Sequence, residues 1–540
     1  MKKIAVLITG SLLLMNTAFA GGILTNTNQS AQFARMLSRN ASIDLDAVYF
    51  NPAGLTQMQN GFYFGIQNQS ITQNRTITSE FPLLNHADYK GEVSAPVFPT
   101  AFAVYKLDNW AFSAGFGPNG GGGSAKYSKG LPSFEKQIAS SVPALSGLSA
   151  LGFPVTGYNV DIQFEGTSVF WGIQLGATYK INDILSVYGG ARYLPSVNTY
   201  SGSITNIQLG PKNALVNGQT YLTNAAAAAS AIAQSTAAGA ASLQPLVAAG
   251  AGGYTIAQVQ GAGYITAAQR AQIEGGLQQM GLTSAQISAM NITAAQSAYS
   301  TFSATMAGTA SVLTANSAAL GDKHVDTKQT GAGFTPIIGV DIHLDKLNIG
   351  LKYEHKTTLT MTNSTKVDDT GLFPDGGKSS SDVPAIIAGG ADYKITDKLK
   401  ASGSFDLYLD KKVNWTKNVY GQVRTIDKNY LELAFGLEYK LTDKFALSAG
   451  YMNSNMGVSQ AYQSDFSYSN DSHTEGIGFQ WNLNKKLVLD AGMMITTYKD
   501  YTKTFDASFD PYAAAIGKSY NETYGKDTFT FAIGIGYKIF

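Results

Sequence analysis

Arg192 and Lys352 are the side chains of this sequence best placed to hold a ligand, because each is a cation within an alternating, mostly apolar stretch. The alternate positions around them carry Val187, Ala191 and Tyr193 in one stretch and Ile349, Leu351 and Tyr353 in the other. A cation that points away from such an apolar row could bind a carboxylate, and Arg offers two parallel donors for it. The alternative is a structural role, in which Glu354, Asp406 or Asp490 neutralises the cation.

The sequence offers no clear catalytic or metal-binding arrangement. It has no cysteine, which excludes disulfides, thiolate catalysis and cysteine-ligated metals. The five histidines are scattered, and none lies in a His-Glu-x-x-His array. Gly115-x-Gly117-x-x-Gly120 matches the dinucleotide fingerprint only by letter, since it contains Pro118 and has no βαβ context. We therefore expect a protein that is not an enzyme and has no metal and no cofactor, with an acyl hydrolase as the alternative.

Residues 1–20 have the pattern of an export signal. Lys2 and Lys3 precede an apolar stretch from Ile4 to Met15, and Ala18-Phe19-Ala20 fits a cleavage site. The apolar stretch is too short to span a bilayer as a helix. We expect an exported chain that begins at Gly21.

From Gly61 to the end of the chain, the dominant pattern is alternation with a period of two. The last such stretch alternates small or polar residues with Phe529, Phe531, Ile533, Ile535 and Tyr537. A soluble sandwich also alternates, but here the polar face carries Gly and isolated charges while aromatic residues bracket the apolar face. This is typical of a membrane barrel, whose side chains face lipid and lumen in turn.

The turns predict the number of strands. Short Asn/Asp/Lys connections lie at residues 107–109, 181–183, 344–346, 396–398, 442–444 and 484–486. Longer, polar or Gly-rich connections lie between them, near residues 80–96, 118–160, 207–330, 368–380, 411–424, 465–475 and 507–523. Strict alternation of short and long connections is the outer-membrane pattern. We predict an all-β membrane protein: a fourteen-stranded antiparallel transmembrane β-barrel over residues 61–540, with a small N-terminal plug over 21–60 and helical extracellular loops.

The two longest loops, at 118–160 and 207–330, carry helical patterns. The second contains four Thr-x-x-Gln capping boxes: Thr255/Gln258, Thr266/Gln269, Thr283/Gln286 and Thr293/Gln296. Ile273 and Leu277 share one helix face, and Phe134 and Ile138 have the same spacing in the first loop. These apolar rows either pack the loops together or form an exposed groove for an apolar ligand, with these four residues as its candidate binding residues.

Asn51-Pro52-Ala53-Gly54 is a good tight-turn sequence and lies in a short apolar segment ahead of the first strand. In this setting it resembles the hatch motif of the FadL-type long-chain fatty acid transporters of the Gram-negative outer membrane, a family that includes aromatic-hydrocarbon importers. Thr335-Pro336-Ile337-Ile338-Gly339 and Asp382-Val383-Pro384 also resemble family positions in the later barrel. The resemblance covers the whole mature chain, although the loop at 207–330 is far longer than the family leads us to expect.

The resemblance implies a hatch in the barrel lumen, ligand capture by outer loops, a lumen pocket and lateral release where the third strand kinks inward. The expected third strand, from Trp110 to Gly117, ends in Gly115-Phe116-Gly117-Pro118. Because Gly and Pro interrupt a strand ladder, Gly115, Gly117 and Pro118 are the candidates for this kink. The alternative is that Pro118 merely ends the strand.

We therefore expect a passive importer of long-chain fatty acids or similar hydrophobic molecules that crosses the cell outer membrane many times. Its partners would be a hydrophobic ligand, outer-membrane lipid and the barrel assembly machinery. With a formal charge of +1, nucleic acid is not expected as a partner, and we expect a monomer. The alternatives are aromatic-hydrocarbon uptake by the same route, and a surface adhesin or structural barrel that acts through the Ala-rich loop.

Overall fold

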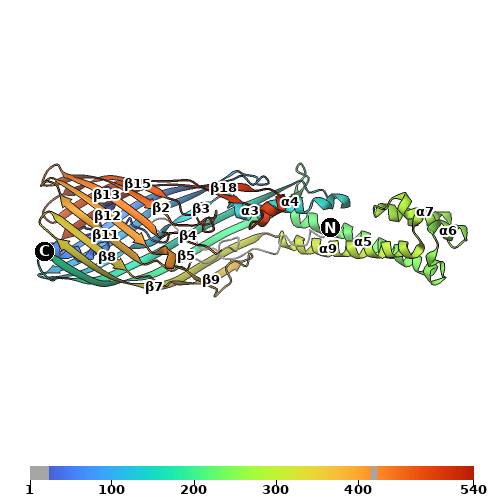
Figure 1. The fold of residues 1–540 in the computed structure, drawn as a ribbon, viewed down its shortest axis with the longest axis horizontal. Helices are drawn as coiled ribbons and strands as arrows, with labels where there is room; N and C mark the ends of the chain where they lie inside the picture. Colours follow the sequence, from blue (N-terminus) through green and yellow to red (C-terminus); the bar gives the residue numbers. More distant parts are fainter. Residues whose placement is uncertain (1–22, 415–422) are drawn as a thin grey trace. The chain divides into compact units, whose positions relative to one another are not determined.

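A closed ring of fourteen antiparallel strands confirms the predicted fold class (Figure 1). The structure is a computed structural model that describes residues 23–414 and 423–540. The expected export signal lies outside the described residues. The ring closes where the first strand, β1, pairs with the last, β18, in a continuous ladder from Tyr63↔Lys538 to Ser79↔Glu522.

Short and long connections alternate between successive strands, as the sequence analysis predicted. Their bounds are β1 (Gly61–Ser79), β2 (Asp88–Leu107), β3 (Trp110–Tyr127), β4 (Gly157–Lys180), β5 (Leu185–Gly210), β6 (Val216–Asn217), β7 (Lys323–His343), β8 (Leu347–Glu354), β9 (Thr360–Asp368), β10 (Lys378–Ser380), β11 (Ile386–Lys394), β12 (Leu399–Tyr408), β13 (Tyr430–Lys440), β14 (Phe445–Asn455), β15 (Ser472–Asn482), β16 (Leu487–Tyr498), β17 (Tyr501–Phe505) and β18 (Tyr520–Lys538). In three places two consecutive elements form one position of the ring: β8 with β9, β10 with β11, and β16 with β17. The two-residue β6 pairs only with the end of β5.

The strands are longer than the sequence led us to expect, and one predicted strand end is wrong. The third strand does not end at Gly117 but continues to Tyr127. The loops expected at 118–160 and 207–330 are correspondingly shorter, since β4 begins at Gly157 and β7 at Lys323. Small residues, Gly120 to Gly123, continue the strand past Pro118, where alternation of apolar and polar residues gave no signal.

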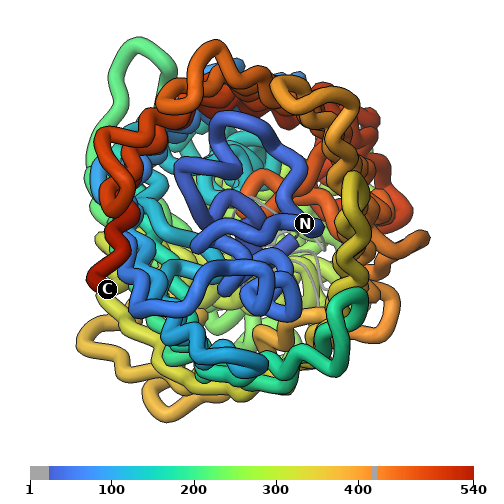
Figure 2. Tube along the Cα trace, turned by 90° about the vertical axis from the view of Figure 1, so that its left-hand side faces the viewer, coloured from blue at the N-terminus to red at the C-terminus, as the bar shows by residue number. Residues whose placement is uncertain are grey.

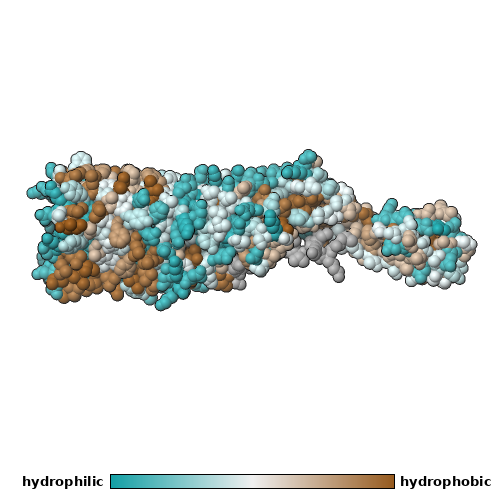
Figure 3. Space-filling view, turned by 45° about the horizontal axis from the view of Figure 1, so that its top comes forward, coloured by the Kyte–Doolittle hydropathy of each residue, from teal (hydrophilic) through white to brown (hydrophobic). Residues whose placement is uncertain are grey.

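The outer face of the barrel is apolar, as a membrane-spanning barrel requires. Figure 3 shows the hydrophobic residues gathered over one part of the barrel. On β18, Phe529, Phe531, Ile533, Ile535 and Tyr537 are between 43% and 46% exposed, whereas Thr530 on the opposite face is buried. Among the described residues, no helix is long and apolar enough to cross a membrane.

The chain divides into two compact units. The helical unit comprises residues 137–160 and 205–322, and the barrel unit comprises the other described residues. The helices outside the N-terminal segment are α3 (Pro132–Ala139), α4 (Ser141–Ala144), α5 (Gly218–Ala248), α6 (Ile256–Gly261), α7 (Ala267–Gln279), α8 (Ser284–Ala289), α9 (Ile292–Ala319) and α10 (Pro511–Ile516), with short 3-10 helices at Ser146–Leu151, Ala251–Gly253 and Asp410–Lys412. In the helical unit α5 and α9 run side by side (Figure 1).

The capping boxes predicted the starts of the small helices. Both reciprocal bonds of the box are present at Thr255, Thr266 and Thr283, so α6, α7 and α8 begin where the sequence placed them. The fourth box is wrong, because Asn291 accepts the backbone N–H of Ala294 and starts α9 two residues before Thr293. Asn is as good an N-cap as Thr.

Residues 23–58, which we call the N-terminal segment, lie inside the ring of strands (Figure 2). The segment contains α1 (Ala31–Met36), α2 (Ala47–Phe50) and a 3-10 helix (Pro52–Gln57). Ser30 caps α1 by accepting the Phe33 N–H at 2.8 Å. Phe33 stacks on Phe50 with ring centroids 5.5 Å apart, so the apolar residues find partners within the segment and on the barrel wall.

Glycines on the inner wall make room for this segment. A Cβ atom at Gly450 of β14 would overlap the Met36 carbonyl group, and one at Gly350 of β8 would overlap the Asn40 carbonyl oxygen. A Cβ at Gly492 of β16 would lie 2.7 Å from the Arg35 backbone nitrogen. The wall therefore approaches the backbone of the segment closely, which only glycine permits.

Replacing Gly450 by Val should expel the N-terminal segment from the lumen while leaving the barrel closed. The clash is with backbone atoms, so no rotamer change relieves it. We expect a small labelled sugar to leak through the variant in liposomes, while the folded barrel keeps its gel mobility. Gly403→Val is the matched control, because its nearest neighbour, the Phe435 ring, lies at an ordinary 3.9 Å. Equal leakage of the two variants would contradict the prediction.

Candidate functional site

Buried ion pairs attach the N-terminal segment to the barrel wall. The Arg35 guanidinium of α1 lies 2.5 Å from Glu438 Oε2 on β13 and 3.0 Å from Asp490 Oδ1 on β16. Within the segment, Arg39 lies 2.7 Å from Asp46 Oδ1, and both side chains are fully buried. Because breaking a buried pair leaves an uncompensated charge, these contacts hold the segment in one position.

The Asn51–Gly54 motif joins the segment to the wall at a second place. The Gly54 N–H donates to the Asn51 carbonyl at 2.8 Å, as a tight turn requires. The Asn51 amide donates to Asp341 Oδ1 on β7 at 2.7 Å, and the Pro52 carbonyl accepts the Thr178 hydroxyl of β4 at 2.7 Å. Ala53 packs against Tyr188 and Ile337. The turn and the contacts with the wall thus explain why each of these four residue types is found at its position.

Arg192 and Lys352 both form ion pairs with Glu354 in this conformation. Arg192 Nη1 lies 2.6 Å and Lys352 Nζ 2.8 Å from the Glu354 carboxylate, and all three side chains are buried. Both cations also lie over the Tyr49 ring of the N-terminal segment, at 4.9 and 4.7 Å from its centroid. This geometry matches the structural alternative, and the assignment of these two residues to ligand binding stays a prediction.

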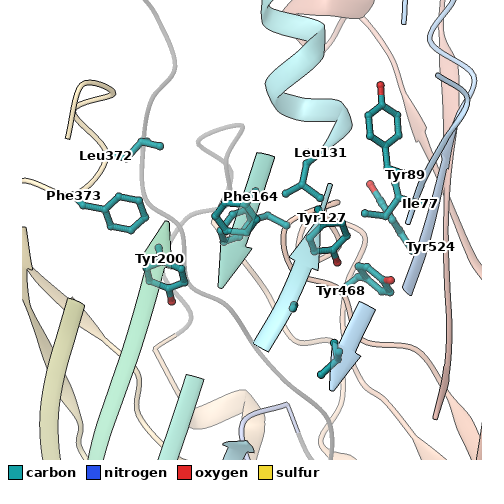
Figure 4. Packing of buried hydrophobic residues seen from close by; sticks show 13 residues of the cluster. Ile77, Tyr89, Tyr127, Leu131, Phe164, Tyr200, Leu372, Phe373, Tyr468 and Tyr524 are labelled. Atoms are coloured by element: carbon teal, nitrogen blue, oxygen red, sulfur yellow. The ribbon is translucent and has the colours of Figure 1, made fainter. Parts of the chain in front are cut away.

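The lumen holds a cavity of about 110 Å³ beside the N-terminal segment. Thr27 and Phe33 of the segment line one side, and apolar side chains from the wall, among them Phe98, Met452 and Met494, line the rest. A cluster of buried aromatic residues fills the barrel further along, around Tyr127, Phe164 and Tyr468 (Figure 4). Tyr468 belongs to both, so the cavity lies between the segment and this cluster.

Lys526 and Glu432 are the two charged residues among the described residues that line this cavity. The Lys526 ammonium lies 4.1 Å from the centroid of the Tyr498 ring, and no carboxylate of the described residues forms an ion pair with it. Arg75 is the direct partner of Lys526 in the β1–β18 register and lies over the Tyr468 ring at 4.5 Å. Lys526 and Glu432 both line this space together with apolar side chains, whereas Arg75 lies outside the lining. The Lys526 ammonium is thus the group at which the anionic head group of an amphiphile could bind.

The sequence analysis missed Lys526 and Arg75, and only the closing register brings them together. The two residues stand 451 positions apart in the chain, one in the first strand and one in the last. Each looks like an ordinary charged residue of a strand end. Only the register between β1 and β18 would have revealed that these two residues are neighbours, and a single sequence does not show that register.

The ladder between β2 and β3 is interrupted next to the cavity. Pairing stops at Ser94↔Ser124 and resumes at Ala101↔Phe116. Three prolines lie in the gap, Pro96 and Pro99 on β2 and Pro118 on β3, and proline cannot donate to a ladder. The sequence analysis named Pro118 but overlooked the two prolines of the neighbouring strand.

The N-terminal segment supplies hydrogen bonds that the interrupted ladder lacks. The Asn26 N–H donates to the Asn119 carbonyl at 2.7 Å, and the Asn26 amide donates to the Gly121 carbonyl at 2.7 Å. The Gln29 amide donates to the Pro118 carbonyl at 2.9 Å. Gly121 and Gly122 have φ of +64° and +114°, values that favour glycine.

The predicted kink residues Gly115 and Gly117 face the N-terminal segment. A Cβ at Gly115 would lie 3.0 Å from Val48 Cγ1, and one at Gly117 would lie 2.8 Å from Thr100 Cγ2. They line a space of only about 10 Å³, barely that of one water molecule. The wall is therefore filled at this place in the present conformation.

Charged and aromatic residues hold α3 against the long-loop end of the barrel. Lys136 Nζ of α3 lies 2.7 Å from Glu522 Oε1 and 4.6 Å from the centroid of the Phe505 ring. The Asp465 carboxylate accepts the Ser133 N–H at 2.7 Å. Burial lowers the pKa of the neighbouring Lys503 ammonium to about 8. These contacts fix α3 to strand ends and loops of the barrel unit.

The four apolar loop residues belong to two different units. Phe134 lies in the barrel unit, where its ring packs edge-on against Phe164 at 5.7 Å. Ile273 and Leu277 belong to the core of the helical unit, and Ile138 is buried in the same unit. The expected spacing on one helix face is correct for Ile273 and Leu277, but they mainly pack α7 against its neighbours. Their part in ligand binding stays a prediction.

Glu354→Gln should destabilise the barrel more than most single substitutions, because it leaves the buried charges of Arg192 and Lys352 without their anion. Removing one partner of a buried pair costs about 3–5 kcal/mol. We expect a lower urea midpoint for the variant in lipid bilayers. Glu165→Gln is the matched control, since Glu165 lies exposed on β4, where its carboxylate accepts a hydrogen bond from the Ser124 hydroxyl. Equal midpoints would show that Glu354 does not balance the two cations.

Comparison with known proteins rests on structure, because no family model and no curated protein matches the chain. A FadL homologue of Pseudomonas aeruginosa has a TM-score of 0.55 and 11% identity, covering 98% of this chain and 100% of its own. A mutant of the monoaromatic hydrocarbon channel TodX has a TM-score of 0.50 and 11% identity, covering 94% and 99%. At this identity the likeness concerns the fold, and the chain has the fold of the FadL-type channels.

Proposed function

We propose that this protein imports hydrophobic molecules across an outer membrane by passive transport. The observation that carries the proposal is the lumen cavity that lies between the N-terminal segment and the interrupted β2–β3 ladder. The two structures of similar fold, a FadL homologue and a hydrocarbon channel, support it. No step needs catalysis or an energy source.

In the proposed mechanism the N-terminal segment is a hatch. A ligand that reaches the cavity displaces Asn26 and Gln29 from the carbonyl groups of β3, and the unpaired stretch of the wall then opens towards the lipid. The molecule leaves sideways, so its hydrocarbon chain stays out of water. This avoids a loss of about 0.8 kcal/mol for each CH₂ group, which an aqueous pore would impose.

We propose a long-chain fatty acid as the ligand, because Lys526 places an ammonium group at the apolar wall of the cavity, where Glu432 is the other charged residue of the described lining. The small size of the cavity favours a second candidate. At about 110 Å³ it is close to the roughly 150 Å³ cavity that binds benzene in another protein. A monoaromatic hydrocarbon would fit without rearrangement, whereas a fatty acid requires the N-terminal segment to move.

Uptake of labelled oleate and of toluene into cells that lack their own importers would test the proposal. We expect oleate to enter cells that express this protein, while a small sugar stays out. Lys526→Met should weaken oleate binding about tenfold or more, since a hydrogen bond to a charged group contributes about 1.5–3 kcal/mol. Lys90→Met, at an exposed position of β2, is the control.

The outcomes separate the candidates. If toluene is taken up equally by the wild type and the Lys526→Met variant while oleate is not taken up, the result would favour the hydrocarbon as the ligand. Entry of the sugar would contradict a closed lumen. Uptake of none of them would contradict transport and favour an adhesin that acts through the helical unit.

The double variant Gly115→Val/Gly117→Val should slow oleate uptake while oleate still binds in the lumen. The added side chains would press on Val48, Thr100 and Gln29 and fix this part of the wall. Binding to purified protein and uptake by cells are measured in parallel, with Gly403→Val as the control. Unchanged uptake would rule out release next to these glycines.

A further inference from the structure

We propose that the helical unit contains a binding site for neutral hydrophobic molecules, in a pocket among α5, α7 and α9. The pocket has a volume of about 1190 Å³, slightly above the usual range of small-molecule sites. Its apolar wall includes Leu148, Ile232, Leu246, Ile273, Phe302 and Met306. Of the candidate ligand-binding residues named in the sequence analysis, Ile273 alone contributes to it.

The pocket contains no formal charge. Among the described residues that line it there is no Asp, Glu, Lys, Arg or His. Arg270 and Glu274 of α7 lie outside the lining and bind each other, with 2.8 Å between Arg270 Nε and Glu274 Oε1. The helical unit as a whole has two further charged residues, Lys212 and Asp322.

Hydroxyl groups in the lining are already used by the protein backbone. The Tyr299 hydroxyl donates to the Ile273 carbonyl at 2.9 Å, and the Thr236 hydroxyl donates to the Ile232 carbonyl at 2.8 Å. Ser235 and Ser242 likewise donate to carbonyl groups of α5, at 3.0 and 2.7 Å. The lining also includes the neutral side-chain amides of Gln269, Gln272 and Gln279, so its described residues offer no cation to an anionic head group.

Ligand selection follows from this chemistry. An ionised carboxylate would leave water for a space with no opposite charge, which is strongly unfavourable. An alcohol, an ester, a hydrocarbon or a protonated acid carries no such penalty. The inference deepens the proposed function, because it names the class of molecule that the helical unit binds. It rests on the proposed function only for what happens to the ligand afterwards.

The pocket also differs from the lumen cavity in a way that a transport route could use. The helical unit would accept any apolar molecule in its neutral form, whereas the lumen cavity offers the Lys526 ammonium to a negatively charged group. Collection and selection would then be separate properties of two sites.

Photolabelling of the full-length protein in lipid nanodiscs tests this inference. The probes are a long-chain alcohol with a diazirine group and the matching carboxylic acid, and mass spectrometry identifies the labelled residues. We expect the alcohol to label residues 232–309 equally at about pH 5 and about pH 9. Each pH unit above the pKa of the acid lowers its neutral fraction about tenfold, so labelling by the acid should fall steeply with pH.

Two pairs of neighbouring substitutions provide matched controls. Ala238→Trp fills the pocket, whereas Ala237→Trp lies on the same helix outside the lining. Ser242→Asp places a charge in the pocket, whereas Ala241→Asp places it outside. The first variant of each pair should lose most of the alcohol label and the second should keep it, at equal helix content by circular dichroism.

Equal labelling within either pair, or labelling by the acid that does not change with pH, would overturn the inference. So would the absence of alcohol label from the helical unit. Cell uptake of oleate is scored separately. Label without uptake would therefore reject the proposed function alone, and uptake without label would reject this site alone.

Discussion

Every backbone N–H and C=O group inside a hydrocarbon layer needs a hydrogen-bond partner within the protein, and the architecture of the barrel unit depends on this constraint. The β1–β18 ladder satisfies it by closing the ring, so no open edge faces lipid. The same constraint makes the gap between β2 and β3 unusual. It persists because prolines remove N–H groups from the gap and because the N-terminal segment binds the carbonyl groups left over.

The N-terminal segment therefore has two physical roles that cannot be separated. It fills the lumen, held by the Arg35 ion pairs and by close approach to wall glycines, and it completes the hydrogen bonding of the gap. If the segment moved, the lumen would lose its filling and the carbonyl groups of the gap would lose their hydrogen-bond donors at the same time. An incoming ligand must replace some of these interactions. Without a ligand, the same interactions are enough to keep the lumen closed.

The sequence carried the fold more clearly than the site. Alternation with a period of two and the strict order of short and long connections predict the fourteen strands, because both follow from local geometry. Asn51, Pro52 and Gly54 also predict their turn, because turn preferences depend on neighbouring residues alone. In contrast, two other features depend on which parts of the chain meet: Arg75 lies opposite Lys526 in the strand register, and Arg35 forms an ion pair with Asp490. The local sequence around a charged residue does not indicate its neighbours in the fold. Pro118 shows the same limit, since its effect depends on Pro96 and Pro99 in the next strand.

The closing ladder has a consequence for the order of assembly. The partners of β1 on one side are more than 440 residues away, so the ring cannot close until the whole chain is available; contacts of such sequence separation form slowly. The segment that precedes β1 binds β13 and β16 through Arg35. These two ion pairs also join parts of the chain that are more than 400 residues apart, so the N-terminal segment can reach its final position only when the C-terminal strands are present.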